Sequence, residues 1–215
     1  LIKTTSQPID EAKTFLLVQD TYKRPLDLAI LVLSHLFLLP VWAVLWLVIP
    51  VAIRLDSKGP VFFPSPAAGK NGQVFKKFKF RTMVWNPTQP GQTYTLSNDP
   101  RVTWVGKFLR STALDELPQL INILKGEMSF VGPRAYSVTT HALRKSEVAG
   151  WNLRLSAKPG LTSAGRFFGD PGNEAYQLKK DLEYIEHCSA LKDLTLLFRS
   201  LLRSFLADWD RKHQS

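Results

Sequence analysis

The groups best suited to chemistry in this sequence are two adjacent carboxylates and an arginine that follows them. Asp115 and Glu116 are neighbours, and Arg134 comes directly after Gly132-Pro133. A carboxylate can serve as a nucleophile, a metal ligand or a proton carrier. An arginine held behind a turn can grip a phosphate with two parallel hydrogen bonds. The pattern predicts phosphate chemistry, although an Asp-Glu pair can also simply favour the first turn of a helix.

The element that must position this pair is a helix that we expect to begin between Ala113 and Leu117. Ser111 or Thr112 can cap it, and Pro118 fits only within the first turn. A helix start presents free N–H groups and partial positive charge, which suit an anion. Four apolar residues at three- and four-residue spacing are predicted to form one buried stripe: Leu117, Leu120, Ile121 and Leu124.

The composition of the chain limits its number of domains, its binding partners and its cellular compartment. Its 215 residues, 45% of them hydrophobic, suffice for one domain with an attached segment. Lys and Arg outnumber Asp and Glu by 28 to 18, so the net charge of +10 should attract polyanions, phosphorylated substrates or anionic lipids. The single cysteine, Cys188, excludes an internal disulfide framework and a Cys-based zinc site, and it fits a reducing compartment.

The strongest compositional feature is the uncharged stretch Leu28–Ile53. An apolar run longer than about 18 residues is typical of a membrane-embedded segment. Pro40 lies near its middle and Pro50 near its end, so the helix should kink or break and the chain can return to the side from which it entered. An ordinary kinked transmembrane helix is the alternative.

Basic residues flank the apolar stretch on both sides. Lys23 and Arg24 precede it, and Arg54 and Lys58 follow it. Positive charge marks the cytoplasmic side of a membrane segment. Because both flanks are equally basic, the charges do not indicate that the two ends lie on opposite sides of the membrane. They agree with both ends on the cytoplasmic side.

The next part of the chain is predicted to form a β-hairpin, with Val61–Phe63 and Val74–Arg81 around a turn at Ala68–Gly72. The second strand alternates phenylalanines with Lys77, Lys79 and Arg81, which places these cations on one face. A solvated face is the default for such a pattern. Interleaved aromatic and basic residues can also bind nucleic acid, but no nucleic-acid-binding motif accompanies them, and we expect no such partner.

Beyond the hairpin the sequence predicts one irregular loop and several helices. Residues Val84–Asn98 are rich in Pro, Gly, Gln and Thr, and a loop of that length is often a lid. The first 21 residues allow a short surface helix. Helical patterns follow the loop at Val105–Leu109, Val138–Ser146 and Glu174–Leu206.

Several ordered motifs of the chain match a known family. They are Lys79-Phe80-Arg81-Thr82-Met83, Asp99-Pro100-Arg101-Val102-Thr103, Arg110-Ser111, Leu114-Asp115-Glu116-Leu117-Pro118-Gln119, Asn122, Lys125-Gly126-Glu127-Met128-Ser129, Val131-Gly132-Pro133-Arg134 and Lys158-Pro159-Gly160-Leu161-Thr162. Together they resemble the bacterial sugar transferase family, the monotopic polyprenyl-phosphate phosphoglycosyl transferases. The resemblance runs from about Lys23 to Leu197.

The resemblance implies transfer of a phospho-sugar from a nucleotide-sugar donor, usually a UDP-sugar, to a polyprenyl phosphate acceptor, with release of the nucleoside monophosphate. It implies Asp115 as the nucleophile of a covalent intermediate, Glu116 as its catalytic partner, and Mg²⁺ held by this pair. Candidate substrate-binding residues are Lys79, Arg81, Arg110, Arg134 and Asp181. A solvated helical acid is the alternative for Asp181, which lies in a segment that resembles the family's late Asp-x-x-Tyr motif.

Two regions of the chain depart from the family pattern. Leu39 precedes Pro40 where the family usually has a serine, with Ser34 the nearest serine before it. Ser163 and Ala164 replace the glycine and tryptophan that commonly follow the Pro-Gly-Ile-Thr motif, which leaves the identity of the donor open.

We therefore expect a helix-rich α/β fold with three parts: an N-terminal segment (1–22), a re-entrant membrane helix (23–58) that kinks at Pro40, and a small globular catalytic domain (59–215) with a β-hairpin and surface helices. It should sit among membrane lipids on the cytoplasmic face of a bacterial inner membrane. The rival functions are a membrane-anchored binding protein without chemistry and an inactive scaffold of the same family. A homodimer is left open.

Overall fold

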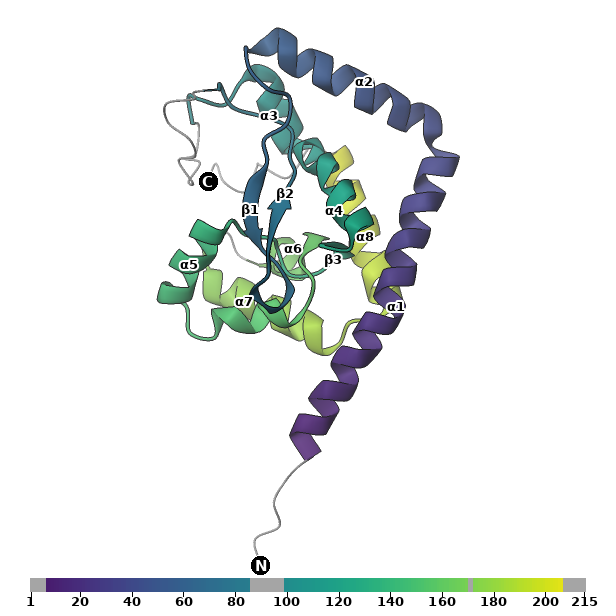
Figure 1. The fold of residues 1–215 in the computed structure, drawn as a ribbon, viewed down its shortest axis with the longest axis vertical. Helices are drawn as coiled ribbons and strands as arrows, with labels where there is room; N and C mark the ends of the chain where they lie inside the picture. The colour runs from purple at the N-terminus through teal and green to yellow at the C-terminus, as the bar shows by residue number, and fades with distance from the viewer. Residues whose placement is uncertain (1–6, 86–98, 170–171, 207–215) are drawn as a thin grey trace, which may run out of the picture.

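The computed structural model describes residues 7–85, 99–169 and 172–206, with side chains from residue 21 onward. Two long helices at the N-terminus frame a small body of helices and two-stranded sheets (Figure 1). The elements are α1 (Gln7–Phe37), α2 (Leu39–Asp56), β1 (Ser65–Ala68), η1 (Lys70–Gly72), β2 (Val74–Lys77), α3 (Trp104–Ser111), η2 (Leu114–Gln119), α4 (Leu120–Lys125), β3 (Ser129–Val131), α5 (Val138–Glu147), η3 (Trp151–Ser156), β4 (Gly160–Thr162), α6 (Ala164–Phe168), α7 (Glu174–Glu186) and α8 (Ala190–Phe205), where η denotes a 3₁₀ helix. The helix-rich α/β class predicted from the sequence is confirmed.

The apolar stretch bends at the junction of α1 and α2. The two helices meet at Leu38, two residues before Pro40, whose ring fits the first turn of α2. The backbone carbonyl of Ser34 accepts hydrogen bonds from the Leu38 N–H at 2.9 Å and from Trp42 Nε1 at 3.1 Å. The tryptophan thus supplies a partner at the break, where no Ser-Pro pair is present.

Helix α1 is longer than the sequence predicted. It continues without a break from Gln7, so the N-terminal segment is not a separate short helix. Lys23, one of the basic residues that precede the apolar stretch, is 5% exposed and donates to the Val131 carbonyl at 2.8 Å and to Asp193 Oδ2 at 2.7 Å. This turn of α1 packs inside the globular body, where a buried charge needs partners.

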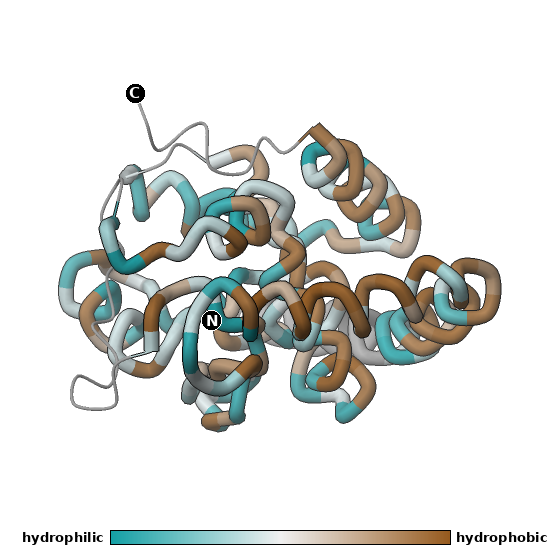
Figure 2. Tube along the Cα trace, turned by 90° about the horizontal axis from the view of Figure 1, so that it is seen from above, coloured by the Kyte–Doolittle hydropathy of each residue, from teal (hydrophilic) through white to brown (hydrophobic). Residues whose placement is uncertain are grey.

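Helix α2 packs on the body through one face only. Ile49 and Ile53 are buried against Phe80 and against Leu109 of α3. The opposite face is apolar and exposed, and it includes Val41, Val44, Leu47, Val48, Val51 and Leu55. Figure 2 shows brown, apolar residues along the end of the molecule where α1 meets α2. By length and composition, Leu39–Asp56 is the one helix of the described residues that could cross a membrane.

Arg81 binds the backbone at the C-terminal end of α2 through hydrogen bonds. Its guanidinium donates to the backbone carbonyls of Ile53, Ser57 and Lys58 at 2.6–3.1 Å. The last carbonyls of a helix have no partner within the helix and carry partial negative charge, so a buried cation stabilises them.

Replacing Arg81 should therefore weaken the fold and leave the chemistry of the protein intact. We expect Arg81→Gln to lower the free energy of unfolding by at least about 2 kcal/mol, because charged hydrogen bonds to buried carbonyls are lost. Thermal unfolding in detergent would measure the loss. An unchanged midpoint would show that these bonds contribute no net stability.

The β-hairpin is confirmed, but its first strand is Ser65–Ala68 and not Val61–Phe63, with Ser65 opposite Lys77 and Ala68 opposite Val74. Its ladder extends to the pair Phe62 and Phe80. The expected solvated face of cations is wrong, because Lys77 and Arg81 are 8% and 4% exposed. Lys77 donates to the Ala135 carbonyl at 2.6 Å. The face that carries Lys77 and Arg81 packs on the protein interior, where both cations donate to backbone carbonyls.

A second, parallel pair of strands joins two distant motifs. Ser129 in β3 lies opposite Gly160 in β4, and Val131 lies opposite Thr162. A Cβ atom at Gly132 would lie 2.3 Å from the Lys158 carbonyl oxygen, so the two backbones touch and only glycine fits. The segments that follow β3 and β4 consequently leave the same edge of the sheet.

The C-terminal region is two helices where the sequence predicted one long pattern. The chain turns between Glu186 and Ala190, and Ser189 caps α8 through its side chain. The short helices predicted after the loop and after Arg134 are confirmed as α3 and α5. Most of the predicted lid loop, residues 86–98, lies outside the described residues.

Candidate active site

The acidic pair lies on the 3₁₀ helix η2, not at the start of an α-helix. Ala113 turns the chain into it with a positive φ of 57°, an uncommon conformation for a residue with a Cβ. Ser111 and Thr112, expected as caps of this helix, instead donate their hydroxyls back to the Phe108 carbonyl of α3. The turn at Ala113 separates these hydroxyls from the N–H groups of η2.

The predicted apolar stripe behind the pair is only partly correct. Leu120 is buried, whereas Ile121 and Leu124 are 39% and 56% exposed and Ile123 is buried in their place. The change from a 3₁₀ helix to α4 at Leu120 shifts the helical phase, which a uniform spacing of 3.6 residues cannot anticipate.

Asp115 and Glu116 are 7% and 6% exposed and are held against the hairpin. The N–H of Phe80 donates to the backbone carbonyl of Asp115 at 2.9 Å. Asn122, fully buried, accepts from the Phe78 N–H at 3.1 Å and donates to the Lys76 carbonyl at 2.8 Å. These bonds dock the hairpin on η2 and α4, and they set the position of Lys79.

Lys79 reaches both carboxylates. Its Nζ lies 3.2 Å from Asp115 Oδ2 and 2.8 Å from Glu116 Oε1. The Lys79 side chain is 23% exposed, so this ion pair borders solvent. An ammonium at this point shows that the space beside the pair accepts positive charge.

Two arginines approach Glu116 from the parallel strands. Arg134 follows β3 and its Nη2 lies 3.4 Å from Glu116 Oε1, while Arg166 in α6 follows β4 and its Nη1 lies 3.5 Å from the same oxygen. Both side chains are about a quarter exposed, at 27% and 26%. The carboxyl ends of parallel strands are a common place for ligand sites.

Arg166 was not anticipated from the sequence. The only signal was its place four residues after the Lys158–Thr162 motif, since no spacing relates it to Glu116 fifty residues earlier. Ser163, one of the departures from the family pattern, accepts from the Arg166 N–H at 3.1 Å and so caps the short helix that carries this arginine.

The electrostatics of the cluster favour ionised groups. Burial alone would raise the pKa of Glu116, but the charges of Lys79, Arg134 and Arg166 outweigh burial and hold it well below its usual range. Burial and the neighbouring Arg134 lower the pKa of Arg166 to about 10. An anionic substrate would relieve the crowding of cations around one carboxylate.

Lys77 is a buried cation behind the cluster. Burial, together with the charges of Lys79 and Arg134, lowers its pKa to about 7. The unfolded chain holds this proton up to its ordinary pKa of 10.5. Between these two values the unfolded state binds more protons, so the contribution of Lys77 to stability rises with pH.

Lys77→Met should flatten this pH dependence. From pH 7 to pH 9 we expect the free energy of unfolding of the unsubstituted protein to gain up to about 1.4 kcal/mol per pH unit relative to the variant. Thermal unfolding of both proteins in detergent, without added magnesium, would measure the difference. Parallel profiles would contradict a neutral Lys77 at high pH.

The remaining predicted site residues lie elsewhere. Arg81 holds α2, as described above. Arg110 donates its Nε to Thr82 Oγ1 at 3.0 Å, beside Arg81. Asp181 is 1% exposed and pairs with Arg154 at 2.5 Å, so the solvated-acid alternative is wrong. Its carboxylate faces the protein interior because α7 packs closely on α6.

The pair can supply part of a magnesium site. Carboxylate oxygens are hard ligands, and Mg²⁺ is commonly held by one or two carboxylates together with substrate phosphates and water. No group of three His, Cys, Asp or Glu side chains with the spacing of a metal site occurs among the described residues. Asp115 and Glu116 therefore fit a metal that arrives with a phosphorylated substrate, and not an all-protein cage.

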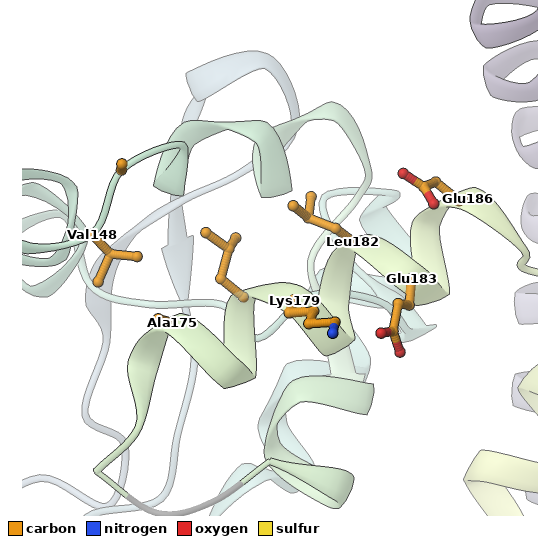
Figure 3. A pocket seen from close by; sticks show the side chains of 8 residues that line it. Val148, Ala175, Lys179, Leu182, Glu183 and Glu186 are labelled. Carbon is orange, nitrogen blue, oxygen red and sulfur yellow. The ribbon is translucent and has the colours of Figure 1, made fainter.

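A separate groove of about 390 Å³ lies on α7, away from this cluster (Figure 3). Its lining includes Val148, Leu178, Lys179, Leu182 and Glu186. It contains neither the acidic pair nor the three cations.

Two buried carboxylates, with Lys79, Arg134 and Arg166 within 3.5 Å of them, form a cluster whose charges suit an anion and whose carboxylates could act as nucleophiles. The chain matches the bacterial sugar transferase family over residues 18–207, and it belongs to that family.

Similar known proteins carry phosphotransferase names. A UDP-glucose:undecaprenyl-phosphate glucose-1-phosphate transferase of Escherichia coli (strain K12) is 38% identical over 86% of this chain and 40% of its own length. A protein of the same name from Caulobacter vibrioides is 35% identical over 85% of this chain and 69% of its length. A UDP-N-acetylgalactosamine-undecaprenyl-phosphate N-acetylgalactosaminephosphotransferase of Aeromonas hydrophila is 32% identical over 83% of this chain and 42% of its length. The chain thus spans about two fifths of the Escherichia coli relative.

Proposed function

We propose that this protein is a phosphoglycosyl transferase that moves a sugar-1-phosphate from a UDP-sugar to a polyprenyl phosphate in the membrane and releases UMP. The observation that carries the proposal is the buried pair Asp115 and Glu116, faced by Lys79, Arg134 and Arg166. The names of similar proteins support the donor and acceptor classes.

In the first step Asp115 attacks the phosphorus nearer the sugar. A bond forms between its carboxylate oxygen and phosphorus, and the bond from that phosphorus to the bridging oxygen of the diphosphate breaks. The bridging oxygen leaves with the electron pair on UMP. Because a carboxylate is a nucleophile in its ionised form, no base is needed to activate it.

In the second step the acceptor regenerates the enzyme. A phosphate oxygen of the polyprenyl phosphate attacks the phosphorus of the aspartyl adduct, and the bond to Asp115 breaks. The products are a polyprenyl-diphospho-sugar and a free carboxylate. Both steps put charge on phosphoryl oxygens, so stabilisation of that charge is the main task of the surrounding residues.

Lys79, Arg134 and Arg166 perform that task. A carboxylate that approaches a diphosphate meets repulsion, and these cations already lie within 3.5 Å of the pair. When the donor binds, its phosphate oxygens replace Glu116 as partners of the two arginines. Bound Mg²⁺, held by Asp115, Glu116 and the diphosphate, would supply further charge neutralisation.

The apolar helices support a position of this site at a membrane surface, where the lipid acceptor would be found. Helices α1 and α2 both contact the same globular body, α1 through β3 and α8, and α2 through α3. This return favours a re-entrant hairpin over a crossing, because a crossing would leave the two ends on opposite sides of the bilayer. The site then faces the cytoplasm, where UDP-sugars are made, and the apolar break at Leu38 lies deepest.

Helix α8 adds a second apolar surface. Asp193, Leu196 and Ser200 face inward, while its outer face carries exposed apolar side chains: Leu191, Leu194, Phe198, Leu201, Leu202 and Phe205. An amphipathic helix of this kind suits the interface between head groups and acyl chains.

UMP release from UDP-sugars tests the proposal. Purified full-length protein in nanodiscs would be given UDP-glucose, UDP-N-acetylgalactosamine or UDP-galactose, with and without polyprenyl phosphate and magnesium. We expect multiple-turnover release of UMP only with donor, acceptor and magnesium together. Binding of donor without release would identify a binding protein or an inactive scaffold and overturn the proposal.

A further inference from the structure

The carboxylate of Asp181 contacts the backbone next to one arginine of the site, Arg166. Its Oδ1 accepts a hydrogen bond from the Gly165 N–H at 2.8 Å, and its Oδ2 accepts from Arg154 Nη2 at 2.5 Å. Burial raises the pKa of Asp181, and Arg154 with the backbone N–H groups of Gly165 and Arg134 opposes that rise. One carboxylate therefore acts on the backbones at Arg134 and at Gly165, the neighbour of Arg166.

Arg154 is fixed as firmly as its partner. It is 3% exposed, and its guanidinium carbon lies 4.7 Å from the ring centre of Tyr136 and 4.4 Å from that of Trp151. Stacking on aromatic faces stabilises a guanidinium, and its planar shape restricts its orientation. Tyr136 follows Arg134 by two residues, so this stack also borders the Arg134 turn.

Helix α6 approaches α7 as closely as its backbone allows. A Cβ atom at Gly165 would lie 2.7 Å from Asp181 Oδ1 and 2.6 Å from the Gln177 carbonyl oxygen. Because no side chain separates the two helices there, a shift of Asp181 would directly displace the backbone that carries Arg166.

We propose that Asp181 and Arg154 are positioning residues, whose buried ion pair holds the backbones at Arg134 and Gly165 so that both site arginines point at the diphosphate beside Glu116. This inference rests on the proposed function. It replaces the expectation that Asp181 contacts substrate, since its carboxylate is occupied by Arg154 and Gly165 inside the fold.

A stabilising role alone would not explain an ion pair at this place. Apolar residues of similar volume often match or exceed a buried ion pair in stability, whereas removal of one partner leaves an unpaired buried charge. Replacing both Arg154 and Asp181 with apolar residues therefore separates an effect on stability from an effect on the position of the site arginines. The double variant Arg154→Met with Asp181→Leu should fold, yet it has no acceptor for the Gly165 N–H.

The experiment compares Asp181→Asn and this double variant with two controls on α7. Leu178→Ala removes a buried apolar side chain, and Glu183→Gln removes an exposed charge of the pair Lys180–Glu183. Each full-length protein in nanodiscs is assayed for UMP release from UDP-glucose, for thermal unfolding, and for hydrogen exchange of the amides at Arg134 and Gly165.

We expect the double variant to lose 10- to 100-fold in kcat at a thermal midpoint close to that of the unsubstituted protein, because small displacements of binding groups are costly in catalysis. Asp181→Asn should lose at least as much. In the double variant, which has no acceptor for it, the Gly165 amide should exchange at least 10-fold faster relative to the amides of α7. Leu178→Ala should lower the midpoint but keep kcat per folded protein within about twofold, and Glu183→Gln should change neither.

A double variant with unchanged kcat and unchanged exchange at Gly165 would overturn the inference, as would a loss in Leu178→Ala that equals the loss in Asp181→Asn at matched stability. A failure of the proposed function gives a different result from a failure of this inference. If the unsubstituted protein releases no UMP, the exchange measurements on the same variants still decide whether the ion pair holds these two backbones.

Discussion

Asp115→Asn should reduce turnover by at least about 10⁴-fold, since removal of a covalent nucleophile is among the most costly single changes in an enzyme. The amide keeps the shape of the side chain but carries no charge with which to attack phosphorus. The measurement is UMP release at saturating donor and acceptor, with Glu183→Gln as a matched surface control that should stay within about twofold of the unsubstituted protein.

A trapping experiment sharpens this prediction. Incubation with UDP-glucose in the absence of acceptor should leave a glucose-phosphate adduct on Asp115, detected by mass spectrometry of the quenched protein. The adduct should be absent from Asp115→Asn. An adduct on Glu116 in that variant, or full turnover without Asp115, would show that the nucleophile was assigned to the wrong carboxylate.

Arg134→Ala should lower kcat by about 10²- to 10³-fold, the usual effect of losing one donor that stabilises transition-state charge. Arg134 contacts Glu116 at 3.4 Å, and this contact helps to keep the pKa of Glu116 low. Its loss should therefore also shift the acidic limb of the pH–rate profile to higher pH, because Glu116 would hold its proton more tightly.

The controls for Arg134 test geometry as well as charge. Arg134→Lys should recover only part of the rate, since an ammonium cannot bind two phosphate oxygens in one plane. Arg144→Ala removes an arginine that pairs with Glu147 and with the partly buried Glu174, outside the acidic pair and its cations, and it should leave kcat per folded protein unchanged. Equal rates for Arg134→Ala and Arg144→Ala would exclude Arg134 from the site.

Local features of the chain were predictable because they depend on nearby residues. The hairpin follows from two apolar runs around a turn, and α3 and α5 follow from short helical patterns. The break near Pro40 follows from the missing N–H of proline. The acidic pair and Arg134 were identified as candidates on the same local grounds, and their roles in catalysis remain predictions.

Predictions from the sequence were wrong where the tertiary structure buries a side chain that the local pattern allowed in solvent. Alternation in the second hairpin strand predicted a solvated face of cations, yet Lys77 and Arg81 lie inside and only Lys79 reaches the acidic pair. Their alternation is the same whether the surroundings are water or protein, so the pattern could not distinguish the two cases. The same limit applies to Asp181, which the spacing of α7 allowed on a solvated face.

By itself, then, the sequence determined the family, the helix-rich class, the hairpin, the break in the apolar segment and the identity of the acidic pair. Only the tertiary structure decided which cations face that pair. Lys79 and Arg166 lie 36 and 50 residues from their carboxylate partners, and their meeting depends on the docking of the hairpin through Asn122 and on the parallel pairing of β3 with β4. Contacts of this kind arise from packing between distant segments, whose geometry no local spacing encodes.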